Sequence, residues 1–180
     1  INNNIKVING RDWRNPDTDI PWSVPIMVRD EFDGDYLAVF DINYSGSTIL
    51  GGQESGVISN WSPQYIRVFA YTIEKQCGWF SCSKNKITRE TKSLEVKIND
   101  RVFKINGDNG NFAVSNELAT ALKNAPSGQA KIRITLEESG ASITNDIGEG
   151  TVKAWKTVYQ EVNHNRDYLS GVNPPVPNPY

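Results

Sequence analysis

The stretch that decides the fold opens with the sequence YIRVFAYTI at residues 65–73. Its alternating pattern predicts a long, half-buried strand. The chain then turns through CGWFSC at residues 77–82, returns, and reverses again at Asn99-Asp100. This order predicts a three-strand antiparallel meander. Its expected strands are residues 65–73, 86–98 and 101–105.

The second turn of the meander also predicts a register. If Asn99 and Asp100 form a two-residue turn, apolar side chains face each other on one side of the hairpin and opposite charges pair on the other side. The expected pairs are Val96 with Phe103, Leu94 with Ile105, and Glu95 with Lys104. Local pattern and turn chemistry therefore agree at this hairpin.

The first turn contains the only two cysteines of the chain, Cys77 and Cys82. Their spacing excludes a CxxC redox motif, and two ligands are too few for a zinc ribbon. We expect a disulfide, which forms in oxidising compartments; a pair of reduced thiols is the alternative. Because so small a ring gains only about 2 kcal/mol from chain entropy, it would shape the tip more than it holds the fold.

Two large aromatic residues, Trp79 and Phe80, lie between these cysteines. On a rigid turn they would form a preorganised anchor for a partner, since little conformational entropy remains to be lost on binding. The alternative is that both side chains fold back onto the sheet.

Shorter alternating runs flank the meander and predict further strands. Asp33-Gly34 is typical of a type I′ turn and would join strands at residues 25–32 and 35–43. Residues 44–63 are rich in glycine and serine, which predicts a long loop with one short strand around Val57-Ile58. Other expected strands lie at residues 5–8, 130–137 and 151–162.

One segment, at about residues 115–125, has the pattern of a helix, with Ser115 as the expected N-cap and an apolar face behind it. The many short strands predict an all-β, antiparallel fold, a β-sandwich or a jelly-roll-like arrangement, with this one short α-helix. We expect residues 1–162 to be a single domain. Residues 163–180 are expected to form an extended, proline-rich tail.

Composition argues against several classes of function. The 180 residues carry a net charge of −2, and no basic face for nucleic acid is expected. No apolar run approaches the roughly 18 residues of a membrane span. His164, the only histidine, lies between two asparagines, which argues against a catalytic triad. We therefore expect a non-enzymatic protein without a cofactor, with a glycoside hydrolase built on paired carboxylates as the remaining catalytic alternative.

Acidic residues cluster at one predicted hairpin. Asp30, Asp33 and Asp35 supply oxygen ligands of the kind that Ca²⁺ prefers. The cluster lacks the spacing and the terminal glutamate of an EF-hand loop, and ordinary Asx turns are the alternative interpretation. Calcium is accordingly the one metal that we consider for this chain.

A second group of residues suggests sugar binding. Trp13 and Trp22 bracket Asp17 and Asp19 in a loop, and Trp61 follows in another predicted loop. An aromatic platform flanked by carboxylates is typical of a carbohydrate site. A lectin-like, glycan-binding module is therefore the alternative function, and it requires exposed tryptophans.

The leading hypothesis is a secreted structural or adhesive subunit at the cell surface or outside the cell. The chain begins at Ile1 without a methionine, which we interpret as a mature, processed form. A β-rich domain must protect its strand edges, and extended ends can complete a neighbour's sheet by strand exchange. We expect a homo-oligomer or polymer, or docking to a surface partner, with residues 1–8 as the exchanged strand. The expected contact residues are Ile5, Val7, Trp79, Phe80, Pro174, Pro175 and Tyr180.

Overall fold

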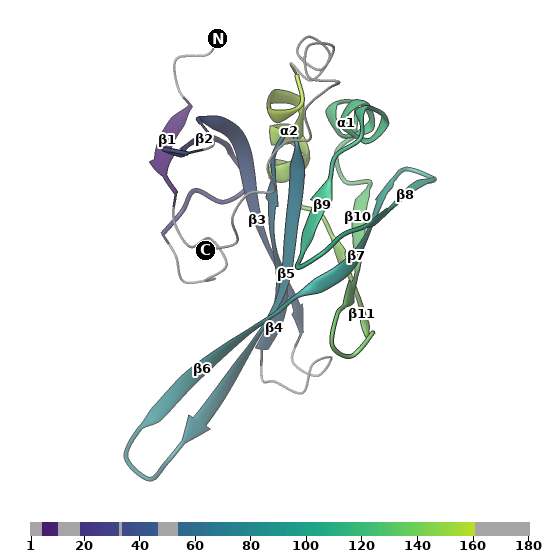
Figure 1. Ribbon diagram of the computed structural model, residues 1–180. Coiled ribbons are helices and arrows are strands. Elements are labelled where there is room, and N and C mark those ends of the chain that lie inside the picture. The colour runs from purple at the N-terminus through teal and green to yellow at the C-terminus, as the bar shows by residue number, and fades with distance from the viewer. Residues whose placement is uncertain (1–4, 11–18, 33, 47–53, 161–180) are drawn as a thin grey trace.

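The computed structural model describes residues 5–10, 19–32, 34–46 and 54–160. Most of these residues lie in strands, which form two sheets, and two short helices pack beside them (Figure 1). The predicted all-β, sandwich-like fold is confirmed.

The larger sheet contains seven strands, and six of them follow one another in chain order across the sheet. Neighbours are antiparallel, except that β1 and β2 are parallel. β9 pairs with the first residues of β5, and β6 pairs with the rest of that strand. The strands are β1 (Lys6–Asn9), β2 (Pro25–Arg29), β3 (Tyr36–Gly46), β4 (Glu54–Trp61), β5 (Tyr65–Cys77), β6 (Cys82–Arg89) and β9 (Asn111–Ala113).

The smaller sheet has the order β11-β10-β7-β8. Its strands are β7 (Thr91–Ile98), β8 (Arg101–Asn106), β10 (Ala130–Leu136) and β11 (Ser142–Asp146). The predicted helix is present as α1 (Asn116–Lys123), where the Ser115 hydroxyl accepts a hydrogen bond from the Leu118 N–H at 3.1 Å. A second helix, α2 (Glu149–Val158), packs against α1, β2 and β3.

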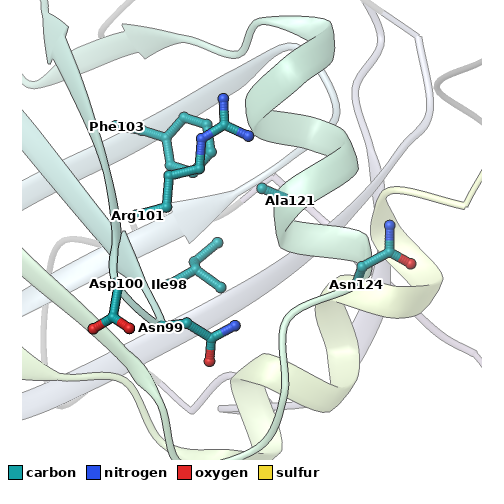
Figure 2. Close-up of a pocket in the computed structure, with 7 residues that line it drawn as sticks. All are labelled: Ile98, Asn99, Asp100, Arg101, Phe103, Ala121 and Asn124. Carbon is teal, nitrogen blue, oxygen red and sulfur yellow. The ribbon is translucent and has the colours of Figure 1, made fainter.

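The predicted register of the β7–β8 hairpin is confirmed pair by pair. Asn99 takes a positive φ of 54°, which asparagine tolerates in a turn, and Figure 2 shows it beside Asp100 at the end of the hairpin. On the exposed side, the carboxylate of Glu95 lies 3.9 Å from the Lys104 ammonium and also pairs with Arg133 of β10. Opposite charges thus meet on one face while apolar pairs fill the other.

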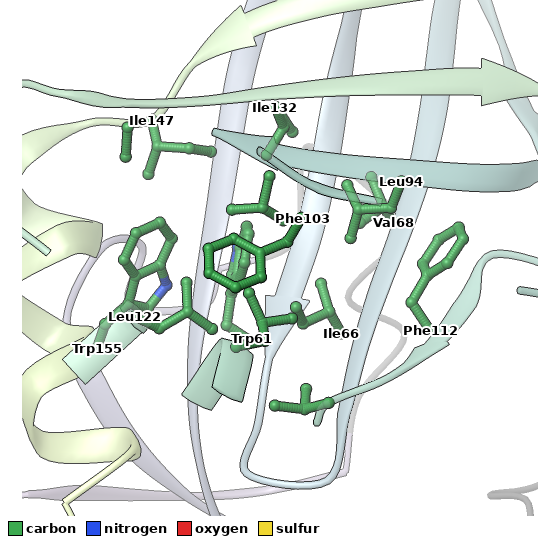
Figure 3. Packing of buried hydrophobic residues seen from close by; sticks show 14 of the residues in the cluster. Trp61, Ile66, Val68, Leu94, Phe103, Phe112, Leu122, Ile132, Ile147 and Trp155 are labelled. Atoms are coloured by element: carbon green, nitrogen blue, oxygen red, sulfur yellow. The ribbon is translucent and has the colours of Figure 1, made fainter. Parts of the chain in front are cut away.

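The main core lies between the two sheets and extends under both helices (Figure 3). Trp61 of β4 and Trp155 of α2 are fully buried at its centre, with ring centroids 4.6 Å apart. A separate cluster, which includes Phe40 and Tyr71, covers the opposite face of the larger sheet. The middle of β5 is therefore buried on both faces, more deeply than its alternating pattern predicts.

The strand predicted at residues 86–98 divides in two. At Glu90 the chain leaves the larger sheet, where β6 lies, and enters the smaller one as β7. The fully buried Thr91 fixes the crossing point, because its hydroxyl donates to the carbonyl oxygen of Val68 at 2.7 Å. The carbonyl oxygen of Thr91 in turn accepts from the Gly110 N–H at 2.9 Å. A strand that changes sheets keeps its alternation, so the pattern does not reveal the change.

The strand predicted at residues 151–162 is wrong, because the described part of this segment forms most of α2. Val152, Trp155 and Val158 are all buried and recur every three residues, which is a helical spacing. The valines and the aromatic residues favoured the strand interpretation by their β propensity alone.

The β2–β3 hairpin is also present, but its connection is longer than the predicted two-residue turn. Pairing ends at Val28 with Tyr36, and Asp33 itself lies outside the described residues. Much of the loop predicted at residues 44–63 belongs to β4, which is eight residues long. The short strands β9 and β11 were not predicted, since their few apolar residues are set among polar ones.

Candidate partner-binding site

The β5–β6 hairpin forms a two-stranded arm that projects away from both sheets (Figure 1). Its strands pair in continuous register from Ala70 with Arg89 to Cys77 with Cys82. We use the term arm for residues 74–85, the part of the hairpin beyond Ile73. Along the returning strand of the arm, residues 82–85 are all exposed.

The sequence explains why the arm leaves the body. Ile73 is buried in the second cluster, but the residues that follow it, Glu74, Lys75 and Gln76, are polar, as are Ser83, Lys84 and Asn85 on the partner strand. A strand pair with no apolar face has nothing to pack against a core. An isolated two-stranded hairpin is only marginally stable in water, so the outer end needs another constraint.

The disulfide supplies that constraint. Cys77 and Cys82 are bonded and lie opposite each other as the last pair of the ladder, as predicted. Inside the ring, the Gly78 N–H donates to the Ser81 carbonyl oxygen at 2.8 Å. The ring therefore holds the four residues between the cysteines in a closed turn, which we call the tip (residues 78–81).

Trp79 and Phe80 at the tip are almost completely exposed, at 97% and 98% of their surface. Their ring centroids are 6.3 Å apart. Neither side chain folds back onto the sheet, so the alternative interpretation of these residues is wrong. Large aromatic side chains are usually buried, and two adjacent ones held out in solvent are the kind of feature that marks an interaction site.

Positive charge follows the aromatic residues along the arm. Lys75 and Lys84 occupy directly opposite positions in the ladder, and Lys86 is opposite Ile73. From residue 74 to residue 86 the chain has three lysines against one acidic residue, Glu74, whereas the whole chain has a net charge of −2.

The predicted terminal contacts fall mostly outside the described residues. Pro174, Pro175 and Tyr180 belong to that part of the chain, as do residues 1–4. Ile5 is half-buried and Val7 is 49% exposed. Val7 lies in β1, which is the edge strand of the larger sheet among the described strands and pairs there with β2 of its own chain. Strand exchange by residues 1–8 stays a prediction.

The three described residues of the predicted sugar site, Asp19, Trp22 and Trp61, do not form an exposed aromatic platform. Trp61 is fully buried, and its indole N–H donates to the Ser59 hydroxyl at 2.7 Å, so its assignment to a sugar site is wrong. Trp22 is half-buried against the second cluster, and Asp19 is exposed. The other two predicted residues, Trp13 and Asp17, lie outside the described residues.

Two of the predicted calcium ligands, Asp30 and Asp35, have partners within the protein. One oxygen of Asp30 accepts from the Phe32 N–H at 2.8 Å, as in an Asx turn. Asp35 forms an exposed ion pair with Arg29 at 3.6 Å. The third residue, Asp33, lies outside the described residues. Within the described segments, no group of three or more His, Cys, Asp or Glu side chains is placed to hold a metal ion.

A shallow hollow of about 570 Å³ lies between the β7–β8 turn and α1 (Figure 2). The Arg101 guanidinium lies 4.6 Å from the centroid of the Phe103 ring and also pairs with Glu117 of α1. Asp100 is the acidic residue of this lining, and Glu117 is the acidic residue of a second hollow of about 440 Å³ that shares Arg101. Each hollow has a single acidic residue in its lining, so the glycosidase alternative, which needs two facing carboxylates, gains no support from these hollows.

A buried polar cluster, which the sequence analysis missed, joins α2 to the larger sheet. Asp41 of β3 is only 2% exposed and accepts hydrogen bonds from the hydroxyls of Thr151, at 2.7 Å, and Ser23, at 3.1 Å. The Asn43 side-chain amide donates to its second oxygen. Thr151 lies in the first turn of α2, where a carboxylate is favoured by the helix dipole. The only signal in the sequence is an aspartate inside the apolar run of β3.

Comparisons with protein-family models, with curated protein sequences and with solved structures find no match to this chain. No helix in the described segments is long and apolar enough to cross a bilayer. A partner-binding site at the tip is therefore inferred from the geometry of the arm alone.

Proposed function

We propose that this chain is a secreted, non-enzymatic attachment subunit, which docks to a surface partner through the tip of its β5–β6 arm. The observation that carries the proposal is the almost complete exposure of Trp79 and Phe80 at the far end of a projecting hairpin. Burying two large aromatic side chains on a partner is a strong source of binding free energy.

The disulfide supports both the docking role of the tip and the secretion of the protein. A ring that fixes the backbone between Cys77 and Cys82 lowers the entropy that the tip loses on binding. A persistent disulfide is also typical of proteins in oxidising, extracellular compartments.

Self-association is the second part of the proposed function. β1 is the edge strand of the larger sheet, and three of its four residues are exposed. An open edge can accept a strand from another copy. In this arrangement the arm attaches to the partner surface while the edge strands join neighbouring subunits.

Binding of coated beads to a panel of surfaces tests the role of the tip. Fluorescent beads carrying the wild-type chain would be applied to an immobilised second copy, a glycan array, supported bilayers and whole cells. We expect at least one surface to retain the beads, and the double variant Trp79→Ser/Phe80→Ser to lower retention there at least about ten-fold.

Phe32 provides the matched control, because it is also 96% exposed at a hairpin connection but lies on the body. Phe32→Ser should leave retention unchanged. Equal retention of wild type and tip variant on every binding surface, or no retention of the wild type anywhere, would refute the proposed attachment role.

A further inference from the structure

We infer that the surface recognised by the tip is the headgroup region of a membrane rich in anionic phospholipids. This inference rests on the proposed attachment role and names its partner. It follows from the shape of the tip, the kind of aromatic residues on it, and the position of the lysines behind it.

The shape of the tip suits a fluid interface better than a protein partner. Two aromatic side chains can bury about 150–250 Å² each, or about 300–500 Å² together. A stable protein–protein interface usually buries at least about 600 Å² on each partner, and the residues behind the tip on β6, Ser83 to Asn85, are polar and exposed. Insertion between lipid headgroups needs no complementary pocket, and the whole surface of a protruding convex tip becomes contact area.

The residue types at the tip are those that prefer the membrane–water interface. The Trp79 ring combines a large apolar surface with one N–H donor, and such rings concentrate at the headgroup level. Phe80 contributes apolar surface without a polar group to desolvate. Interfacial segments bury their apolar side about 5–10 Å into the boundary between headgroups and acyl chains, a depth that a turn of four residues can reach.

The lysines lie where anionic headgroups would be. At about 3.3 Å per residue along a strand, Lys84 and Lys86 lie about 7 Å and 13 Å behind Cys82. With the tip inserted, Lys84 would lie within about one Debye length of the lipid surface at physiological ionic strength. Lys84 is exposed, so an anionic surface would attract its ammonium group.

Vesicle co-sedimentation of the full chain tests this inference. The probes are vesicles of phosphatidylcholine alone and vesicles that also contain about 30 mol% of the anionic lipid phosphatidylserine. We expect binding to the anionic vesicles, which weakens as the salt concentration rises because the Debye length shortens. Trp79→Ser/Phe80→Ser should weaken binding at least about ten-fold.

Two double lysine variants distinguish a specific effect of the arm lysines on vesicle binding from a general effect of net charge. Lys84→Ser/Lys86→Ser should weaken binding to anionic vesicles about five-fold or more, and most of the loss should come from Lys84, which lies within about one Debye length of the lipid surface. Lys97→Ser/Lys153→Ser removes the same charge from exposed positions on β7 and α2 and should have little effect. Equal effects of the two pairs would mean that binding follows net charge, which contradicts a tip-directed contact.

Fluorescence reports whether the tip itself enters the lipid. Trp79 is 97% exposed, so insertion of the tip should shift its emission to the blue when vesicles are added, and a variant without Trp79 separates this signal from that of the other four tryptophans. Trp79→Phe should keep most of the binding and lose the shift. Binding to vesicles without a blue shift would overturn the inference. Tip-dependent retention on glycans, on cells or on a second copy, without vesicle binding, would also overturn it and leave the proposed attachment role intact.

Discussion

Among single residues, Asp41 shows how one buried carboxylate can position a helix. It accepts hydrogen bonds from Thr151 on α2 and from Ser23, which precedes β2. These partners are 110 and 18 residues away in sequence. The cluster therefore joins three parts of the fold through one side chain.

Replacing Thr151 by valine should destabilise the protein. The change keeps the shape of the side chain but removes the hydroxyl that donates to Asp41 at 2.7 Å, and a hydrogen bond to a charged group contributes about 1.5–3 kcal/mol. Urea unfolding should show a fall of that size in the free energy of unfolding. Thr144→Val, at an exposed position of β11, is the control and should stay within about 0.5 kcal/mol of wild type. Equal losses in the two variants would contradict this role of Asp41.

Among the secondary-structure elements, the arm is the one whose stability depends least on packing against the body. Few apolar residues anchor it beyond Ile73, and its outer end is closed by the disulfide. Elements with few buried contacts open locally at a much lower free energy than the core. Loss of the disulfide should therefore change the local stability of the arm without changing that of the body.

Cys77→Ser/Cys82→Ser should loosen the arm and spare the body. Without the ring constraint, worth about 2 kcal/mol, amide hydrogen exchange in residues 74–85 should speed up about ten-fold or more. Exchange in β7 and β10 should not change, since these strands lie in the smaller sheet. Hydrogen-exchange mass spectrometry measures both. Faster exchange throughout the core would show instead that the disulfide holds the whole fold.

Features with local causes were predictable from the sequence. The β7–β8 register follows from a turn and an alternating pattern, the start of α1 from Ser115, and the bridge from the spacing of two cysteines. Features with long-range causes were not predictable from the sequence. The sheet change at Glu90 depends on Thr91 meeting Val68, and α2 was mistaken for a strand because its valines and aromatics suit both structures.

At the scale of the whole molecule, three of the described tryptophans lie at the two extremes of exposure. Trp61 and Trp155 fill the main core, while Trp79 is 97% exposed. The candidate site was predictable as a pair of residues in a small ring. The projection of this site from the body was not predictable, because it depends on where the two sheets end.

Trp155→Ala should therefore destabilise the protein strongly, whereas Trp79→Ala should leave its stability almost unchanged. The first removes a fully buried ring packed on Trp61 and should cost about 3–5 kcal/mol. The second should change the free energy of unfolding by no more than about 0.5 kcal/mol. Thermal or urea unfolding of the two variants measures the difference. A large loss from Trp79→Ala would mean that the tip packs against the protein in solution.

The change of sheet at Glu90 also governs how the molecule carries mechanical load. A pull on the tip acts on both strands of the hairpin in the same direction. β5 is held by β4 and β9, and β6 runs on into β7, which is held by β8 and β10. The tension therefore divides between the two sheets and acts along their ladders, so that many hydrogen bonds resist in shear instead of opening one after another.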